Sequence, residues 1–395
     1  MQRTSMGVAS LQASERFSTT AAQLASLAVL QLVVYASMQV PVGILLDRFG
    51  PRAMISIGAL VMALGQALVA SAEVLEWAIV GRMLVGMGDA FTFISMIRMS
   101  NNWLSGRKAA IAQQWLATIG QLGQILSAVP FVFILHLSGW NFAFATMSAF
   151  GLAVGVLVFV GARDSKLPGE HRSASLSLVL QTLRRNVKRP SVQMAFWTHF
   201  TVQSPGTVFA LLWGVPFLVE AEQKSPAYAA TVLTVFVLTN AALGPVIGAF
   251  TAKYPHKRLH LVYMALGLGV CAWALVLSWP GLIPDWLGFL LVLMIGVGGP
   301  TSMVAFDFSR TYVVKSELGA TNGFINIGGF LAALTMMASI GFVLDGIKIS
   351  GMSKELYTVG GFRLAFMTQF AVLLIGAFGL TLSARKTART ERQLH

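Results

Sequence analysis

Charged residues are scarce in this sequence: only 11% of its 395 residues are Asp, Glu, Lys or Arg, whereas 56% are hydrophobic. A soluble domain carries about 25% charged residues. The hydrophobic excess is therefore too large for one soluble core and is typical of a protein in a lipid bilayer. Cysteine is also scarce, and the single residue Cys271 cannot form an intrachain disulfide.

Catalytic motifs are missing as well. The sequence contains no P-loop, no nucleophile elbow and no set of ligands at metal-binding spacing. We therefore expect no enzyme activity, no cofactor and no metal site. Without a nucleotide-binding motif, the expected energy source for any transport is an ion gradient.

What is present is a series of long apolar runs. A transmembrane helix must cross about 30 Å of hydrocarbon, and membrane strands are not expected because the runs lack the roughly ten-residue alternation of a barrel. We predict an all-α polytopic membrane protein with about 11 full spans. The runs are 23–46, 53–72, 75–98, 109–135, 140–162, 192–219, 228–252, 259–279, 286–310, 319–344 and 361–384.

The net charge is +13, which in a soluble protein would suggest nucleic-acid binding. Here the positions of the basic residues matter more. If the turn at Asp47–Arg52 is cytoplasmic, alternation of the spans places 21 of the 28 basic residues on the cytoplasmic side. This distribution obeys the positive-inside rule. We expect a multi-pass protein of the inner cell membrane with a cytoplasmic C-terminus, whose partner is the lipid bilayer and not nucleic acid.

A polar, basic segment divides the apolar runs into two groups. We predict an N-terminal helical bundle over 1–163, a cytoplasmic central linker over 164–190 and a C-terminal helical bundle over 191–395. The second group has six runs and the first has five, preceded by residues 1–13, which resemble the last turns of a helix. Most of a first helix is expected to be missing; a late start codon, a fragment or a true eleven-helix variant would each explain it.

The two groups are related by an internal repeat. Gly43 and Gly248 end matching Pro- and Gly-containing segments 205 residues apart, and Gly86 and Gly296 begin matching Gly-x-Gly segments 210 residues apart. Parallel repeats of this kind are a known plan of transporters, in which the solute binds between the halves near the middle of the membrane. The repeat therefore predicts alternating access.

The first charged turn carries a family resemblance. The segment from Gly43 to Arg52 closely resembles the signature loop between helices 2 and 3 of the major facilitator superfamily. Arg82, followed by two closely spaced glycines, resembles the helix 4 motif of that family. The loop residues that fit the pattern are Gly43, Asp47, Arg48, Gly50 and Arg52.

The resemblance implies a fold of two pseudo-symmetric six-helix bundles, here with the first helix largely missing, in a transporter that is expected to be monomeric. One segment departs from the pattern of drug–proton antiporters, which carry a Gly-Pro-rich motif on helix 5. The corresponding segment here reads IGQLGQILSAVP. This difference makes a multidrug antiporter the less favoured interpretation.

Charged residues at the helix ends are candidates for a gate. Asp47, Arg48 and Arg52 could pair across the cytoplasmic face in one conformation and separate in the other, or could merely set the topology. Asp307 and Arg310 are three residues apart and share a helix face. We expect them to pair, in a gating or a structural role.

Charged residues inside the spans are candidates for coupling. An unpaired charge at a helix centre costs about 2.5–3.5 kcal/mol on insertion scales, so Arg82 and Asp89 must pair or face water. They form either a coupling network or a structural pair between helices. His199 could carry the transported proton or be a neutral hydrogen-bonding group. Arg98 lies close enough to the cytoplasmic end to reach interfacial water.

Five residues are candidates for solute binding. Trp197 and Gln203 lie on the seventh helix of the full family pattern, and Gln121 and Asn326 are amides at matching positions of the two halves. Buried amides must find hydrogen-bond partners, which can be other helices or a solute. Arg3, in the helix remnant, could contact an anionic solute or anchor the end of the chain at the interface.

These observations predict a secondary active transporter that moves a small solute by alternating access. We expect proton coupling and, from the arginines, an organic anion as the solute. The alternatives are efflux of a neutral or drug-like solute and a solute receptor on the same fold that does not transport.

Overall fold

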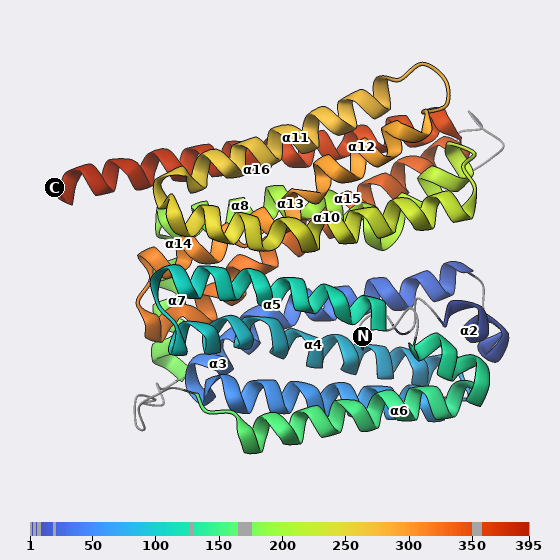
Figure 1. Cartoon of the computed structure of the whole chain (residues 1–395), viewed down its shortest axis with the longest axis horizontal. Coiled ribbons are helices and arrows are strands. Elements are labelled where there is room, and N and C mark those ends of the chain that lie inside the picture. The colour runs from blue at the N-terminus through green and yellow to red at the C-terminus, as the bar shows by residue number, and fades with distance from the viewer. Residues whose placement is uncertain are drawn as a thin grey trace. The chain divides into compact units, whose positions relative to one another are not determined.

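The computed structural model describes residues 2, 5, 9–18, 21–126, 130–164, 176–349 and 358–394. Helices make up nearly all of this described part, and no strand occurs in it (Figure 1). The all-α prediction is confirmed. The first helices in chain order are α2 (Ser10–Phe17), α3 (Ala21–Ser71), α4 (Leu75–Trp103), α5 (Gly106–Leu126), α6 (Val132–Gly161) and α7 (Leu176–Val187).

Helix α3 contains two of the expected spans, joined at Gly50. This residue has φ 79° and ψ 163°, outside the helical region. Positive φ is accessible to glycine because it has no Cβ. Gly50 therefore turns the chain between the two segments and sets the charged residues before and after it at the ends of different helices.

The later helices begin with α8 (Pro190–Val208), which continues through two π-helical segments to Ala221. The long span near residue 300 is divided into three helices at Val297 and Met303. The remaining α-helices are α9 (Gly214–Pro216), between the two π-helical segments, α10 (Pro226–Lys253), α11 (Arg258–Ser278), α12 (Asp285–Gly296), α13 (Gly298–Ser302), α14 (Val304–Tyr312), α15 (Leu318–Ile349) and α16 (Val359–Leu394).

The chain forms two compact units. Unit 1 comprises Met1–Ser105, Ile119–Arg185 and Val313–Phe324. Unit 2 comprises Gly106–Thr118, Asn186–Tyr312 and Ile325–His395. Each unit therefore takes in short pieces from the other half of the sequence, and unit 1 includes the first turns of α15. The predicted boundaries at residues 163 and 191 remain a prediction.

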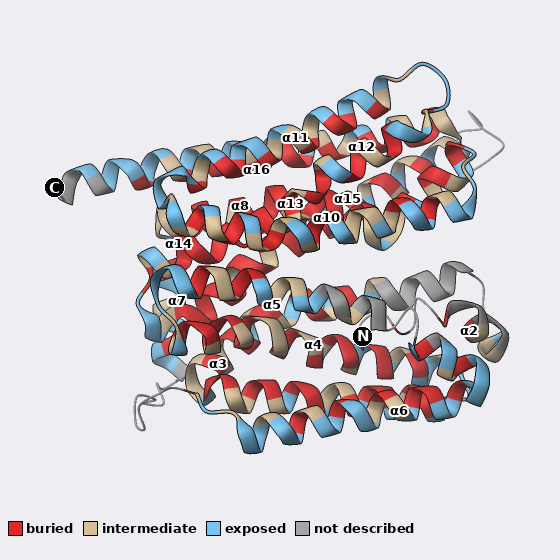
Figure 2. Cartoon of the chain, viewed as in Figure 1, coloured by how far each residue is buried: buried red, intermediate tan, exposed pale blue. Residues whose placement is uncertain are grey.

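Each unit has its own core. In unit 1, Trp140 and Phe144 pack with ring centroids 4.4 Å apart, and the Trp140 indole donates to the Val69 carbonyl at 2.9 Å. In unit 2, Trp273 stacks on Phe366 at 4.5 Å. Figure 2 shows buried residues along one side of most helices and exposed residues along the other. Both cores are aromatic and apolar, so the polar groups inside them need specific partners.

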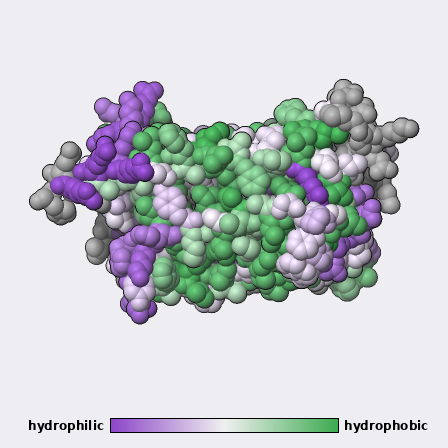
Figure 3. Space-filling view, turned by 90° about the horizontal axis from the view of Figure 1, so that it is seen from above, coloured by the Kyte–Doolittle hydropathy of each residue, from purple (hydrophilic) through white to green (hydrophobic). Residues whose placement is uncertain are grey.

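The outward-facing residues are also apolar. Among the described residues, nine helices are long and apolar enough to cross a membrane, and the stretch Val29–Ser71 counts as one of them although it holds two expected spans. Val160 on α6 and Phe378 on α16 are 77% and 72% exposed. Figure 3 shows a surface that is hydrophobic in its middle, with hydrophilic residues gathered toward its ends. A lipid bilayer is the solvent that suits such a surface.

Candidate functional site

Asp47 caps the start of α15. Its Oδ1 accepts a hydrogen bond from the Gly319 N–H at 2.8 Å, and its Oδ2 accepts one from the Ala320 N–H at 2.7 Å. The first N–H groups of a helix have no partner within the helix and carry a partial positive charge. One carboxylate therefore fixes the N-terminal end of α15 within unit 1.

Arg98 compensates the charge of Asp47. Its Nη1 lies 3.8 Å from Asp47 Oδ1, with the two side chains 6% and 3% exposed. The same nitrogen donates to the Lys315 carbonyl in the turn that precedes α15. The expectation that Arg98 reaches interfacial water is therefore wrong. A buried carboxylate attracts a guanidinium more strongly than a screened interface does, because the local dielectric is lower.

Gly43 permits this approach. It lies one helical turn before Asp47, and a Cβ built on it would be 2.6 Å from the Gly319 oxygen and 2.8 Å from the Ala320 Cα. Both neighbours are backbone atoms, so they cannot turn away as a side chain can. Only glycine lets α3 come close enough for the Asp47 carboxylate to reach both N–H groups.

The other arginines of the turn have different partners. Arg48 lies over the ring of Phe49, at 5.1 Å. The Arg52 backbone N–H donates to Asp164 Oδ1 at 2.6 Å, and its Nε donates to the Phe159 carbonyl at 2.7 Å. In this structure the acid of the turn therefore pairs with Arg98 on α4, while Arg52 ties the turn to the end of α6.

Asp307 is the centre of a second charged cluster, in unit 2. Its Oδ1 accepts from Arg310 Nη2 at 2.6 Å, which is the expected pair at three-residue spacing. Its Oδ2 lies 3.7 Å from Arg258 Nε, and Arg258 Nη1 donates to Thr311 Oγ1 at 3.2 Å. The cluster contains two guanidiniums and one carboxylate.

Arg82 is buried among polar groups in the N-terminal half of α4. The residue is 2% exposed. Nη1 donates to Ser5 Oγ at 3.1 Å and the Gln2 carbonyl at 3.4 Å, and Nη2 donates to Gln31 Oε1. Asp89 lies on the same helix and interacts with Arg82 electrostatically. The structure thus places Arg82 in a polar region of unit 1, and Asp89 lies seven residues further along the same helix.

His199 occupies a polar cluster in unit 2. Its Nε2 lies 3.1 Å from Asn326 Oδ1 and its Nδ1 lies 3.3 Å from the Ser302 carbonyl. Ser302 Oγ also donates to Gln203 Oε1 at 3.4 Å. A neutral imidazole has one N–H, but the assignment of an amide oxygen and nitrogen can be exchanged. The cluster can therefore satisfy His199 in either protonation state by a half-turn of the Asn326 amide.

Trp197 does not join this cluster. Its ring packs edge-on against Phe196 at 5.2 Å and Phe200 at 5.1 Å, and it lies against Gly379 of α16. Two further predicted residues cannot be placed. Arg3 lies outside the described residues, and the side chain of Gln121 is also outside the described part.

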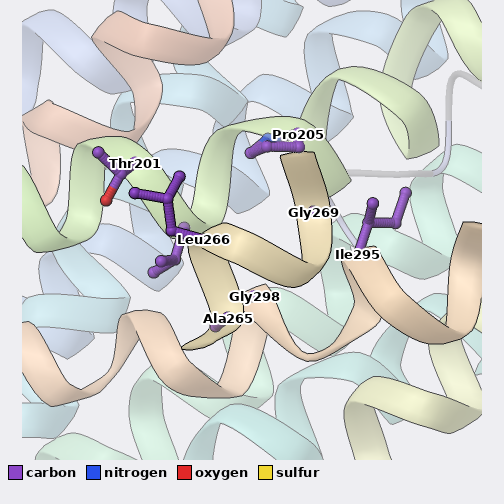
Figure 4. Close-up of a pocket in the computed structure, with 8 residues that line it drawn as sticks. Thr201, Pro205, Ala265, Leu266, Gly269, Ile295 and Gly298 are labelled. Atoms are coloured by element: carbon purple, nitrogen blue, oxygen red, sulfur yellow. The ribbon is translucent and has the colours of Figure 1, made fainter. Parts of the chain in front are cut away.

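A small hollow in unit 2 lies beside α8, α11 and α12 (Figure 4). Its lining includes Pro205, Leu266, Gly269 and Ile295 and is almost wholly apolar. The hydroxyl of Thr201, which also lines it, donates to the Trp197 carbonyl at 2.9 Å. The hollow therefore offers no polar group for a charged solute and is separate from the His199 hydrogen bonds.

Arg98 and Arg258 are two buried arginines whose partners sequence reasoning missed. The internal repeat could have found them. With an offset of 205–210 residues, Arg98 corresponds to the region of Asp307, and Arg258 corresponds to the turn that carries Asp47. Each half therefore has one acid and one base at these two corresponding places.

Comparison with known proteins agrees with this architecture. The family model of the Major Facilitator Superfamily matches residues 1–335. The Escherichia coli protein named "Probable L-galactonate transporter" is 24% identical over 156 residues, or 40% of this chain and 34% of that protein. This chain therefore spans about a third of the length of that relative. The hexuronate transporter of Bacillus subtilis is 22% identical over 346 residues, which are 84% of this chain and 80% of that one.

Among solved structures, the E. coli fucose:proton symporter matches with a TM-score of 0.65 and 18% identity, covering 96% of each chain. At this identity the match shows a shared fold. The two sequence relatives are named as transporters rather than enzymes. With the family model covering most of the sequence, the repeated halves and the charged turn after Gly43, the chain belongs to the Major Facilitator Superfamily and is a multi-pass membrane protein of that transporter family.

Proposed function

We propose that this protein is a proton-coupled secondary transporter of a small organic anion, in the inner cell membrane with its C-terminus in the cytoplasm. The observation that carries the proposal is Arg82, a buried guanidinium that donates hydrogen bonds to oxygen atoms of Gln2, Ser5 and Gln31 in the interior of unit 1. A guanidinium binds a carboxylate through two parallel, charge-assisted hydrogen bonds. The relatives named for L-galactonate and hexuronate point to the same class of solute.

Asp89 supplies the coupling. It interacts with Arg82 electrostatically, so in its ionised form it competes with a solute carboxylate for the guanidinium. Protonation of Asp89 removes this competition, and the proton and the anion then favour each other's binding, as reciprocal linkage requires. His199 is the second proton site, because its cluster satisfies both protonation states. Proton symport is also the activity named for the fucose symporter, which supports this assignment.

The charged clusters act as gates. Asp47 and Arg98 hold the start of α15 in one state and release it in the other, while Gly43, Gly50, Arg48 and Arg52 shape the turn that carries the acid. The cluster of Asp307 and Arg310 has the corresponding role in the other half. Release exchanges the two N–H···O hydrogen bonds and the ion pair of Asp47 for hydrogen bonds with water.

Two of the remaining candidates are suited to uncharged groups of a solute. Gln203 and Asn326 have amide groups in the His199 cluster of unit 2, and amides can hydrogen-bond the hydroxyl groups of a sugar acid. Arg3, Gln121 and Trp197 stay predictions for solute binding, and Trp197 has the weakest support because its neighbours are aromatic. The protein is expected to act as a monomer.

Flux into liposomes tests the proposal. The purified chain is reconstituted and supplied with labelled L-galactonate, labelled glucuronate or, as the neutral control, labelled fucose, with and without an inward proton gradient. We expect gradient-driven uptake of an acid that a protonophore abolishes and little uptake of the neutral sugar. Arg82→Gln should abolish uptake of the acid, and Arg82→Lys should retain part of it.

Asp89→Asn separates coupling from binding, because a permanently neutral side chain mimics the protonated form. It should lose gradient-driven uptake but keep exchange of labelled for unlabelled acid across the membrane. Asp345→Asn, which alters an exposed acid on α15, is the matched control and should behave as the unchanged protein. Flux that does not respond to the gradient would contradict proton coupling. Preferential flux of the neutral sugar would contradict an organic anion as the solute, and binding without exchange would identify a receptor.

A further inference from the structure

Helix α16 is longer than a membrane span. It has 36 residues, which correspond to about 54 Å at a rise of about 1.5 Å per residue. The hydrocarbon layer is about 30 Å thick. The C-terminal turns of α16 therefore continue into the headgroup layer and the water beyond it, whichever solute the protein moves.

One exposed stripe follows the outer side of this helix and changes from apolar to cationic along its length. Its members recur at intervals of three or four residues and so share one face. The first three are 70%, 72% and 42% exposed, and the three arginines that follow are also exposed. In order they are Leu374, Phe378, Leu382, Arg385, Arg389 and Arg392.

The opposite face of the same turns is held against the protein. Ser383 and Thr387 are only 3% and 7% exposed, and the Tyr263 hydroxyl of α11 hydrogen-bonds Thr381 at 2.9 Å. The helix is therefore fixed as far as Thr387. The exposed face that carries the lipid-facing Phe378 continues past Leu382, and there its exposed residues are arginines.

The three arginines have no ion-pair partner among the described residues. The segment 385–392 contains four basic residues and one acidic residue, Glu391. A face that is embedded in acyl chains up to Leu382 meets lipid headgroups one turn later. Guanidinium groups bind phosphate oxygens through paired hydrogen bonds, and each basic residue near an anionic membrane surface contributes attraction.

We propose that Arg385, Arg389 and Arg392 form a docking surface for the headgroups of anionic phospholipids in the leaflet at the C-terminal end of α16. We call these three residues the arginine stripe. The continuity with the lipid-facing residues favours a lipid over a soluble partner, since any ligand here must lie beside the acyl chains that cover Phe378 and Leu382. The bound lipid anchors α16 from outside while Thr387 holds it from inside.

The test uses the purified full chain in a mild detergent, titrated with dioleoylphosphatidylglycerol or with dioleoylphosphatidylcholine. Bound lipid is counted by native mass spectrometry. We expect the anionic lipid to bind in preference to the zwitterionic one. The triple variant Arg385→Gln, Arg389→Gln and Arg392→Gln should weaken binding of the anionic lipid roughly a hundredfold, since each residue accounts for about a fivefold change. The corresponding lysine variant should retain most of the binding.

The control removes three positive charges elsewhere. Arg163, Lys253 and Lys257 are exposed and have no ion pair among the described residues, and their change to Gln should leave lipid binding within about twofold if attraction depends on the stripe. Equal loss in the control would mean general charge attraction, and full binding by the triple variant would remove the site. Either result overturns the proposal. Two further results would also overturn it: displacement of the bound lipid by soluble glycerol phosphate, and a triple variant that loses a co-purifying protein while it keeps its lipid.

Discussion

The two halves of the protein place opposite charges at corresponding positions. In unit 1 the acid, Asp47, lies at the turn and the base, Arg98, lies on the following helix. In unit 2 the base, Arg258, lies at the start of α11 and the acid, Asp307, lies in the first turn of α14. In both units an ion pair therefore joins the same two positions of the repeat, but the acid and the base have exchanged positions.

The exchange has a structural consequence. Asp47 has one arginine neighbour and uses both oxygens to bind the N–H groups that begin α15. Asp307 has two arginine neighbours, and each of its oxygens faces one of them. An acid on the turn can therefore hold a helix end, whereas an acid between two guanidiniums is occupied by them. The charge of Asp47 therefore helps to set the position of α15, whereas the charge of Asp307 is compensated by its two arginine neighbours.

The largest effect is expected from Asp47→Leu. It leaves the Arg98 guanidinium buried without its acid and removes the cap of α15. Loss of one partner of a buried pair costs about 3–5 kcal/mol. The free energy of unfolding should fall by about that amount, as measured by denaturant unfolding in detergent. The double variant Asp47→Leu with Arg98→Leu should regain part of the loss; additive effects would contradict the pairing.

Asp307→Leu should be less damaging. Arg310 and Arg258 are then left facing each other, but their side chains are 16% and 11% exposed and can reach water more easily than Arg98. A hydrogen bond to a charged group contributes about 1.5–3 kcal/mol, which is the loss of unfolding free energy that we expect. A cost equal to that of Asp47→Leu in the same assay would remove the distinction between the two clusters.

Gly43→Ala and Gly248→Ala compare equivalent glycines of the two halves. A Cβ at Gly43 meets backbone atoms of α15, whereas a Cβ at Gly248 would lie 2.7 Å from Cγ of the Gln114 side chain. Overpacking costs about 1–3 kcal/mol, and a side chain can move where a backbone cannot. Gly43→Ala should therefore lower the thermal midpoint more than Gly248→Ala does. Gly267→Ala, where a Cβ meets nothing within 4 Å, is the control and should not lower it.

The smallest effect concerns Glu222, a carboxylate that forms no ion pair within 4 Å among the described residues. It is 1% exposed and accepts a hydrogen bond from the Ile283 N–H at 2.7 Å. Burial raises its pKa above the usual value, although the Ile283 N–H, Arg363 and Lys224 oppose the shift. Because the folded state holds the proton more tightly than the unfolded state, this group stabilises the fold at low pH and loses that contribution as pH rises through its folded pKa.

Thermal unfolding between pH 4 and pH 7 measures this contribution. The midpoint of the unchanged protein should fall with rising pH relative to that of Glu222→Gln, whose amide does not titrate. Glu220→Gln is the neighbouring control and should keep the dependence. An opposite slope would mean that Arg363 and Lys224 outweigh burial, and it would contradict this prediction.

Much of the fold and part of the site followed from the sequence. The apolar runs predicted the helices, and the spacing of Asp307 and Arg310 predicted their contact because residues three apart share a helix face. Arg98 was misassigned, since its partner lies 51 residues away and helix periodicity does not reveal contacts at that distance. Trp197 was predicted to bind solute, but it packs against Phe196 and Phe200 and does not join the His199 cluster, because residues two apart on a helix point in different directions.

The sequence by itself determined that this protein lies in a membrane, that its halves are repeats and that it belongs to a transporter family, because these properties reside in composition, periodicity and a local motif. Only the tertiary structure decided which charges are neighbours. Asp47 meets the start of α15 and Arg98 because three helices converge there at a glycine. Partner choice among buried charges depends on distances of a few ångströms, and those are set by the packing of the whole unit.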